Sequence, residues 1–164
     1  MNGTKKEVKS MSLSLRPIDK TNVLDCFALR LGPGQEVFVS SPMRSLALSY
    51  AYRDTCIPLG LYDGETLVGY GMLLYTPEDK TYTLWHFMID LPQQGKGYGR
   101  DALARLLERI SEEPLGPARQ ARLLVNPQNA PAIHLYRSFG FAETGYVENG
   151  ENEMTVAAPF SAIQ

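Results

Sequence analysis

The chain has 164 residues and a formal net charge of −2, and 44% of its residues are hydrophobic and 21% charged. This length allows one domain with a substantial core and is short for two, while the composition excludes wholesale disorder. The near-neutral charge gives no sign of the broad basic surface that nucleic-acid binding requires.

Cysteine usage and hydropathy narrow the class of protein further. The two cysteines, Cys26 and Cys56, are too few for a disulfide scaffold, and neither lies in a C-x-x-C pair or at metal-ligand spacing. No apolar run approaches the ~18 residues of a membrane span. We therefore expect a cytoplasmic protein with two reduced, partly buried thiols, no metal site and no membrane or nucleic-acid partner.

The N-terminal third predicts one strand and two helices. Residues 1–10 are polar, which predicts a flexible arm rather than a secretory signal, ahead of a single domain over 11–164. Alternation over 12–18 predicts a strand, and an apolar stripe over 22–31 predicts a helix ended by Gly-Pro-Gly. Ser40-Ser41-Pro42 predicts the start of a helix that runs to about residue 52. We expect four residues to form its packing face: Met43, Leu46, Ala47 and Tyr50.

The middle of the chain predicts a hairpin, a central strand and a helix. Two strand-like runs over 57–75 flank Asp63-Gly64, the dipeptide of a tight type I′ turn. Bulky apolar residues over 81–90 predict a buried strand. Leu103, Leu106, Leu107 and Ile110 follow the i, i+3, i+4, i+7 spacing, which predicts an amphipathic helix over 100–113.

The C-terminal third predicts three strands and one helix. A short strand over 121–125 precedes a helix that Asn129 caps and Gly140 ends. The Asn149-Gly150 turn pairs strands 141–147 and 153–157. The order β-α-α-β-β-β-α-β-α-β-β predicts an α/β (α+β) fold in which helices cover a mixed sheet.

A glycine-rich loop joins the central strand to the next helix. Gly95, Gly97 and Gly99 let the backbone approach a ligand, and the helix start offers unpaired N–H groups to an anion. Arg100 occupies the last glycine position of the dinucleotide fingerprint G-x-G-x-x-G, and no Walker A run exists. The loop reads Q-x-x-G-x-G from Gln94, which resembles the pyrophosphate loop of the GNAT superfamily of N-acetyltransferases. The alternative is a glycine-rich turn without a ligand.

A second motif supports the same resemblance. Residues 129–141 match N-x-x-A-x-x-L-Y-x-x-x-G-F of that family at every named position. The resemblance covers about residues 12–158, and GLYDGETLVGYGM and FMID make it similar to bacterial spermine/spermidine (diamine) acetyltransferases. It implies a mostly antiparallel sheet of six to seven strands with about four helices, and acetyl-CoA as co-substrate.

The resemblance also implies roles for individual residues. Main-chain groups of Met88 and Ile89 would pair with the pantetheine arm and face the thioester carbonyl, and Asn129 would hold that arm. Tyr136 would stand near the sulfur and protonate the leaving thiolate, although an aromatic residue on an apolar helix face is also an ordinary core residue. The pyrophosphate would be wrapped by the main-chain N–H groups of the whole loop: Gln94, Gly95, Lys96, Gly97, Tyr98, Gly99 and Arg100.

The general base stays open at this stage. His86 titrates in the useful range, but strict alternation places it opposite Trp85 and Phe87 unless a bulge changes its face. The family's glutamate on this strand aligns with Thr83, which cannot act as a base, so a water chain is an equal alternative. We expect His134 to be solvated and Asp90 to be structural.

The acceptor also stays open. Glu36 and Asp54, near the acceptor helices, are candidates for cation recognition, although an ordinary solvated surface explains them equally well. The first hypothesis is acetyl transfer to a primary amine of a small molecule such as a polyamine, by direct attack in a ternary complex. A protein or peptide acceptor and a non-enzymatic acyl-CoA-binding module are the alternatives. The family resemblance also allows a homodimer through the C-terminal strands.

Overall fold

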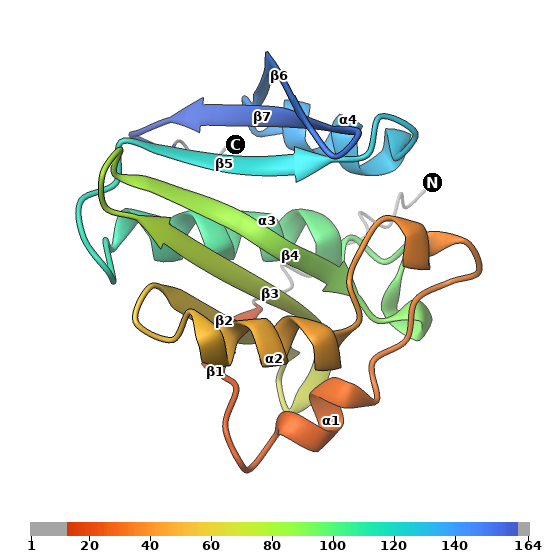
Figure 1. Cartoon of the computed structure of the whole chain (residues 1–164). Helices are drawn as coiled ribbons and strands as arrows, with labels where there is room; N and C mark the ends of the chain where they lie inside the picture. The colour runs from red at the N-terminus through yellow and green to blue at the C-terminus, as the bar shows by residue number, and fades with distance from the viewer. Residues whose placement is uncertain (1–12, 161–164) are drawn as a thin grey trace, which may run out of the picture.

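The computed structural model describes residues 13–160, so the arm expected at 1–10 lies outside the described residues. Seven strands form one sheet in the order β1-β2-β3-β4-β5-β7-β6. Helices α1 and α2 lie on one face, and α3 and α4 lie on the other (Figure 1). The elements are β1 (Ser14–Pro17), α1 (Val23–Phe27), η1 (Gln35–Val37), α2 (Pro42–Ala51), β2 (Cys56–Asp63), β3 (Thr66–Thr76), β4 (Thr81–Ile89), η2 (Leu91–Gln93), α3 (Tyr98–Ser111), β5 (Gln120–Val125), α4 (Ala130–Ser138), β6 (Ala142–Glu148) and β7 (Glu151–Ala157).

The predicted order of helices and strands is confirmed, with two short 3₁₀ turns, η1 and η2, added. All neighbouring strands pair antiparallel except β4 and β5, so the sheet is mixed and mostly antiparallel, as expected. The helix predicted over 22–31 is shorter than expected: α1 ends at Phe27, and the chain continues without helix to η1.

The packing face predicted for α2 is confirmed only at Leu46, which packs against a core cluster. Met43 is 62% exposed and Tyr50 is 74% exposed, whereas Ser45 is fully buried. The helix begins as predicted, because the Ser41 side chain accepts a hydrogen bond from the Arg44 N–H group. It lies over a cavity rather than squarely on the sheet, so Arg44 faces that cavity. This orientation turns the apolar stripe of Met43 and Tyr50 to solvent.

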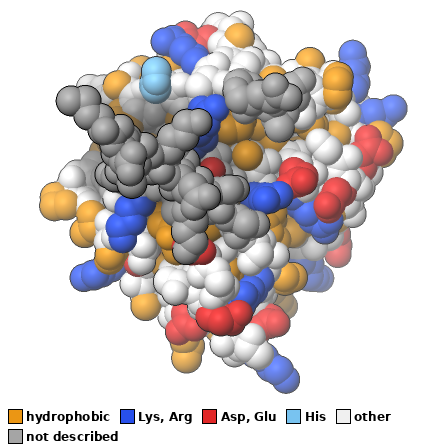
Figure 2. Space-filling view, turned by 180° about the vertical axis from the view of Figure 1, so that it is seen from behind, with side chains coloured by type: hydrophobic (Ala, Val, Ile, Leu, Met, Phe, Trp, Pro, Cys, Tyr) orange, Lys and Arg blue, Asp and Glu red, His pale blue; other side chains and the backbone are white. Residues whose placement is uncertain are grey.

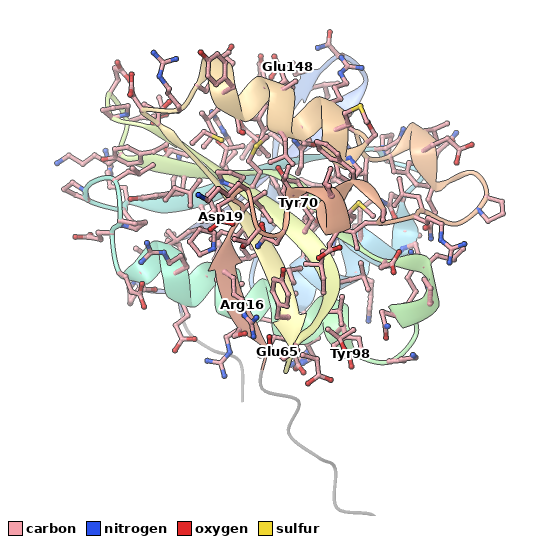
Figure 3. The ribbon with its side chains drawn as sticks, turned by 90° about the horizontal axis from the view of Figure 1, so that it is seen from below. Arg16, Asp19, Glu65, Tyr70, Tyr98 and Glu148 are labelled. Carbon is pink, nitrogen blue, oxygen red and sulfur yellow. The ribbon has the colours of Figure 1, made fainter. Side chains whose placement is uncertain are left out.

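The β2–β3 hairpin forms with its turn one residue later than predicted. Asp63 pairs with Thr66, so Gly64 and Glu65 are the two loop residues, and Gly64 takes the positive φ of 59°. Arg16 fixes the tip from β1: its guanidinium donates to the Gly64 carbonyl at 2.6 Å and to both oxygens of the Glu65 carboxylate at 3.0 Å (Figure 3). The hairpin is thereby tied to the edge of the sheet.

The β6–β7 hairpin forms as predicted. Glu148 pairs with Glu151, and both loop residues have positive φ: 50° at Asn149 and 82° at Gly150. This is the requirement of a type I′ turn, which matches the twist of the flanking strands.

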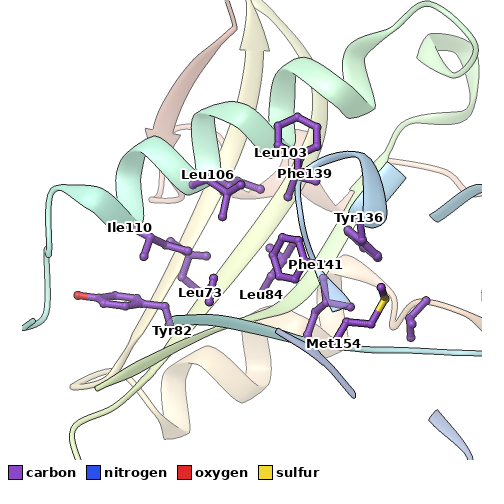
Figure 4. Packing of buried hydrophobic residues seen from close by; sticks show 14 of the residues in the cluster. Leu73, Tyr82, Leu84, Leu103, Leu106, Ile110, Tyr136, Phe139, Phe141 and Met154 are labelled. Carbon is purple, nitrogen blue, oxygen red and sulfur yellow. The ribbon is translucent and has the colours of Figure 1, made fainter. Parts of the chain in front are cut away.

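The largest core cluster lies between the sheet and helices α3 and α4 (Figure 4). Leu103, Leu106 and Ile110 of α3 are at most 1% exposed, so the predicted stripe does face the sheet. Burying side chains of this size stabilises the fold by about 2 kcal/mol each. The α3 helix, and with it the glycine loop at its start, is therefore held firmly against β3 and β4.

Strands β4 and β5 separate soon after they meet. Their parallel ladder joins only Thr81–Thr83 to Gln120–Arg122, and the strands then diverge across the sheet (Figure 1). At the point of divergence, Arg122 Nε donates a hydrogen bond of 3.1 Å to Thr83 Oγ1. The edge of β4 beyond Thr83 consequently has no neighbouring strand, which leaves main-chain groups free for a ligand.

Both cysteines are free and buried, as expected, and burial raises the pKa of each thiol to about 11. Acidic and basic side chains are interspersed on the face seen from behind (Figure 2), in keeping with the small net charge. Within residues 13–160, no helix combines the length and apolar character needed to cross a lipid bilayer.

Candidate active site

A cavity of about 720 Å³ opens where β4 and β5 separate. Every residue of β4 from Thr83 to Ile89 lines it, so the free strand edge forms its floor. The remaining walls come from the η1–α2 segment, the glycine loop, the end of β5, α4 and the β6–β7 turn. Those used below are Gln35, Arg44, Gln94, Asn129, Tyr136, Glu148 and Glu151.

The glycine loop has the backbone form that an anion site needs. Gly95 and Gly97 have positive φ values of 74° and 91°, and Gly97 precedes the first residue of α3 without a side-chain cap. The Gln94 N–H group donates to the Leu91 carbonyl, and that of Arg100 donates to the Gly97 carbonyl. In the described part of the chain, the N–H groups of residues 95–99 donate to no protein acceptor. The free N–H groups therefore span a shorter stretch than residues 94–100, which the sequence predicted.

The side chains of this loop point elsewhere. Tyr98 is buried, and its hydroxyl donates a 2.6 Å hydrogen bond to Asp63 at the end of β2, a contact that raises the pKa of Tyr98. The Arg100 guanidinium lies 5.3 Å from the centre of the Phe139 ring. Tyr98 therefore offers a ligand only its main-chain N–H group.

The Gln94 side chain bridges two sides of the cavity. Its Nε2 donates to the Ile89 carbonyl at 3.0 Å and to Gln35 Oε1 at 2.8 Å, and Gln35 Nε2 donates back to Gln94 Oε1 at 3.0 Å. The first residue of Q-x-x-G-x-G thus joins the loop to β4 and to η1.

The ladder between β3 and β4 decides which main-chain groups reach the opening. The Asp90 N–H group donates to the Val68 carbonyl, and antiparallel pairs alternate between bonded and unbonded. The groups of Met88 therefore face β3, whereas those of Phe87 and Ile89 face the opening. The contact that the family resemblance assigns to Met88 stays a prediction, while the main-chain N–H group of Ile89 is free on the side of the opening.

A β-bulge in β4 determines where His86 points. His86 pairs with Met72 and Leu84 pairs with Leu73, so Trp85 is the extra residue between them. Consecutive side chains then lie on one face, and the Trp85 and His86 rings stack with centroids 5.3 Å apart and planes 14° apart. The bulge allowed for in the sequence places His86 beside Trp85 rather than opposite it.

The environment of His86 keeps its ring neutral. Desolvation by burial, followed by the positive charge of Arg44, lowers the pKa of His86 to about 4. Its Nδ1 atom is buried and has no hydrogen-bond partner among residues 13–160. Near neutral pH this imidazole therefore carries a lone pair and no charge.

Tyr136 and Asn129 reach the cavity from α4. Tyr136 is buried, and this burial raises the pKa of its phenol, which therefore keeps its proton near neutral pH. Asn129 caps α4 as predicted, with its Oδ1 accepting a 3.4 Å hydrogen bond from the Ala132 N–H group. Its amide nitrogen is left for other partners. Both residues line the same cavity as the glycine loop.

Two acidic residues at the cavity were missed at the sequence level. Glu148 and Glu151 line it, and burial together with the charge of Glu148 raises the pKa of Glu151. Glu36 and Asp54, the candidates for cation recognition, are exposed and lie outside the cavity lining, as the alternative of an ordinary solvated surface expects; a role in cation recognition stays a prediction. The available signal was the sequence E-N-G-E, in which a tight turn brings two carboxylates together.

Two further expectations, for His134 and Asp90, are met. His134 is exposed, and Asp90 is structural, since its Oδ1 accepts a 2.8 Å hydrogen bond from the Arg30 N–H group. Thr83 receives the hydrogen bond of Arg122 and has no basic group to offer.

Residues 24–141 match the model of the acetyltransferase (GNAT) family. The chain belongs to the GNAT family. It is 29% identical to the spermine/spermidine N(1)-acetyltransferase of Bacillus subtilis strain 168, over 88% of this chain and 97% of that protein. It is 25% identical to the L-2,4-diaminobutyric acid acetyltransferase of Shouchella clausii strain KSM-K16, over 80% of this chain and 72% of that protein.

The fold is also that of a solved N-acetyltransferase structure. Spermidine N-acetyltransferase from Vibrio cholerae, in complex with CoA and spermine, matches with a TM-score of 0.72 and 20% identity, over 89% of this chain and 95% of that one. As a GNAT protein the chain is an N-acetyltransferase of the EC 2.3.1 class, with acetyl-CoA as its co-substrate.

Proposed function

We propose that this GNAT enzyme acetylates a primary amine of a small polycationic molecule, a polyamine, by direct attack on acetyl-CoA within a ternary complex. The observation that carries this proposal is the placement of Glu148 and Glu151 on the wall of the cavity that contains the free β4 edge. Carboxylates there lower the energy of a second ammonium group while the first amine reacts. The diamine and polyamine acceptors named for two relatives support this choice.

The cofactor side of the cavity suits a diphosphate. The free N–H groups of residues 95–99 converge at the positive end of α3, a helix of 14 residues. Lys96 and Arg100 add positive charge at the same place. We propose that these groups hold the pyrophosphate, that Phe87 and Ile89 pair with the pantetheine arm through the main chain, and that Asn129 secures that arm from α4.

This arrangement then aligns the reacting atoms. An amine that enters from the α2 side meets the thioester at the β4 edge, where a main-chain N–H group such as that of Ile89 can stabilise the developing oxyanion. Tyr136 approaches from α4 with its proton retained, so we assign it the protonation of the departing thiolate.

No covalent enzyme intermediate is needed in this scheme. Cys26 and Cys56 are outside the cavity lining, and their raised pKa values keep them as thiols. Alignment of two bound substrates supplies the rate advantage instead. Two buried, free thiols also suit the cytoplasm, where we place the enzyme. We also propose that the enzyme forms a homodimer through β6 and β7.

An amine panel tests the proposed function. Release of free thiol from acetyl-CoA is followed with spermine, spermidine, 2,4-diaminobutyrate, a monoamine of matched chain length and a lysine-containing peptide. We expect turnover with the polyamines to exceed that with the monoamine. Turnover with the peptide alone would favour the protein acceptor, and calorimetric binding of CoA without any turnover would favour a non-enzymatic module.

A further inference from the structure

The imidazole of His86 is held in the cavity by the sheet itself. Its position follows from the bulge at Trp85, which turns two successive side chains onto the α2 face of β4. The indole of Trp85 packs against one side of the ring, and the Tyr52 ring meets that indole edge-on at 5.2 Å. This stack fixes the plane of the imidazole without using either ring nitrogen.

The two ring nitrogens are not equivalent. Nδ1 is buried, whereas Nε2 is neither buried nor hydrogen-bonded in the described part of the chain, which leaves it as the nitrogen open to the cavity. Buried polar atoms in folded proteins are almost always paired. Because an unpaired buried nitrogen costs stability, the burial of His86 is not explained by its contribution to the stability of the fold.

Charged and titratable groups line the same cavity from several elements, and Arg44 is the one whose charge acts on His86. Arg44 lies on α2, Tyr136 on α4, and Glu148 and Glu151 flank the β6–β7 turn. None of the carboxylates forms a hydrogen bond with His86, so the ring lacks the acidic partner that would raise its basicity. It is consequently uncharged whenever the amine binds, and it does not repel a cationic substrate.

We propose that His86 is a catalytic residue that accepts, at Nε2, the proton that the acceptor nitrogen loses during acetyl transfer. This proposal rests on the proposed function. It resolves the choice between His86 and a water chain that the sequence leaves open. It also accounts for the absence of a glutamate at Thr83, because the proton acceptor lies three residues further along the same strand.

The bond changes balance as follows. The amine nitrogen forms a bond to the thioester carbon, and the carbonyl electron pair moves to oxygen. When the carbonyl re-forms, the carbon–sulfur bond breaks and the sulfur takes the Tyr136 proton, while the nitrogen gives its extra proton to His86. Acylation makes that nitrogen far more acidic than the free ammonium, so a weakly basic imidazole is sufficient. Proton exchange with water in the cavity restores Tyr136 and His86.

The test compares the two histidines of the chain. In His86→Ala we expect kcat to fall by about 10²–10⁴-fold, as for the loss of a general base, while calorimetric affinity for CoA stays within twofold. Added imidazole should restore part of the lost kcat, because it fits the space that the ring vacates. His134→Gln, on the exposed face of α4, should match the wild type and serves as the control.

Each result decides the proposal. An unchanged kcat in His86→Ala overturns it, and so does a loss that imidazole at any concentration fails to rescue, since that would be a structural role. If His86→Ala fails to fold, His86→Gln replaces it, because a neutral amide preserves polarity and volume but cannot take a proton. Absence of turnover in the wild type with every amine would refute the proposed function instead, so the two failures are distinguishable.

Discussion

Gln35 and Gln94 exchange two amide hydrogen bonds, at 2.8 and 3.0 Å, across the mouth of the cavity. One residue belongs to η1 on the acceptor side, and the other begins the glycine loop on the cofactor side. Gln35 Oε1 also accepts a 2.7 Å hydrogen bond from the Gly32 N–H group. The Gln35–Gln94 hydrogen bonds therefore connect the two substrate sites, so a displacement of η1 is transmitted to the glycine loop.

We predict that Gln35→Ala weakens the binding of both substrates. Removing the amide frees η1 and also releases the side chain that positions Gln94, so the KM for the amine and the Kd for CoA should both rise. A double-mutant cycle with Gln94→Ala should give a coupling energy of about 1 kcal/mol. Gln128→Ala, an exposed glutamine in the β5–α4 connection, is the control. Additive effects of Gln35→Ala and Gln94→Ala would refute the coupling.

We predict that Tyr136→Phe lowers kcat by about 10²-fold and leaves CoA affinity nearly unchanged. The substitution removes the proton donor and keeps the ring that packs 5.8 Å from the Phe141 ring. Steady-state kinetics and calorimetry measure the two effects separately. Tyr146→Phe changes a tyrosine that is 55% exposed on β6, and it should resemble the wild type. A kcat within twofold of the wild type would remove the acid role from Tyr136.

We predict that Glu148→Gln and Glu151→Gln each raise the KM for spermine by up to about tenfold, as expected for loss of one partly solvated charge contact of ~1 kcal/mol. The kcat at saturating spermine should change less. The raised pKa of Glu151 means that it takes up a proton at a higher pH than an ordinary glutamate. Spermine KM should therefore increase early as the pH falls, and this increase should be weaker in Glu151→Gln.

The control for these charge changes is Glu78→Gln, which removes an exposed carboxylate from the β3–β4 turn. If Glu78→Gln raises the spermine KM as much as Glu148→Gln and Glu151→Gln do, the effect is one of net charge, and the assignment of Glu148 and Glu151 to the spermine site fails.

We predict that Tyr98→Phe weakens CoA binding without any loss of a side-chain contact to the ligand. The lost hydrogen bond to Asp63 frees the first turn of α3, so the N–H groups around it become less well ordered. Calorimetry with CoA measures the change in Kd. Tyr50→Phe alters a tyrosine that is 74% exposed and should have no effect. Equal affinity in Tyr98→Phe would show that the loop holds its shape without the hairpin.

His86 should also make stability depend on pH. Its pKa is about 4 in the folded chain against an ordinary value of 6.5. Below pH 6.5 the unfolded chain takes up a proton that the folded chain refuses until about pH 4, so the free energy of unfolding falls through this window. Urea unfolding at several pH values should show a smaller fall in His86→Gln. Parallel curves would contradict the lowered pKa.

Local patterns were sufficient to predict most of the fold. The caps at Ser41 and Asn129 and the Asn149-Gly150 turn depend on neighbours a few residues away, and each forms as predicted. The stripe of α3 is also local, because one helix packs on one sheet. Only Leu46 of the face predicted for α2 is covered, because the cavity beneath the helix determines which of its sides is buried.

The site could be predicted less completely because its geometry is long-range. The Q-x-x-G-x-G loop is visible in the sequence, but the Tyr98–Asp63 contact joins residues 35 positions apart. The bulge at Trp85 follows from the pairing of β4 with β3, and the sequence of β4 alone does not predict its position. Glu148 reaches the cavity only because β7 inserts between β5 and β6.

The three-residue ladder between β4 and β5 has a further consequence for native-state motion. It divides the sheet into a four-stranded part (β1 to β4) and a three-stranded part (β5, β7 and β6), which are joined only by this short ladder. Amide hydrogens of β5 and β7 should therefore exchange with deuterium sooner than those of β3, through a sub-global opening. A bound ligand that contacts both parts of the sheet would stabilise the junction between them, and it should slow amide exchange most in the three-stranded part.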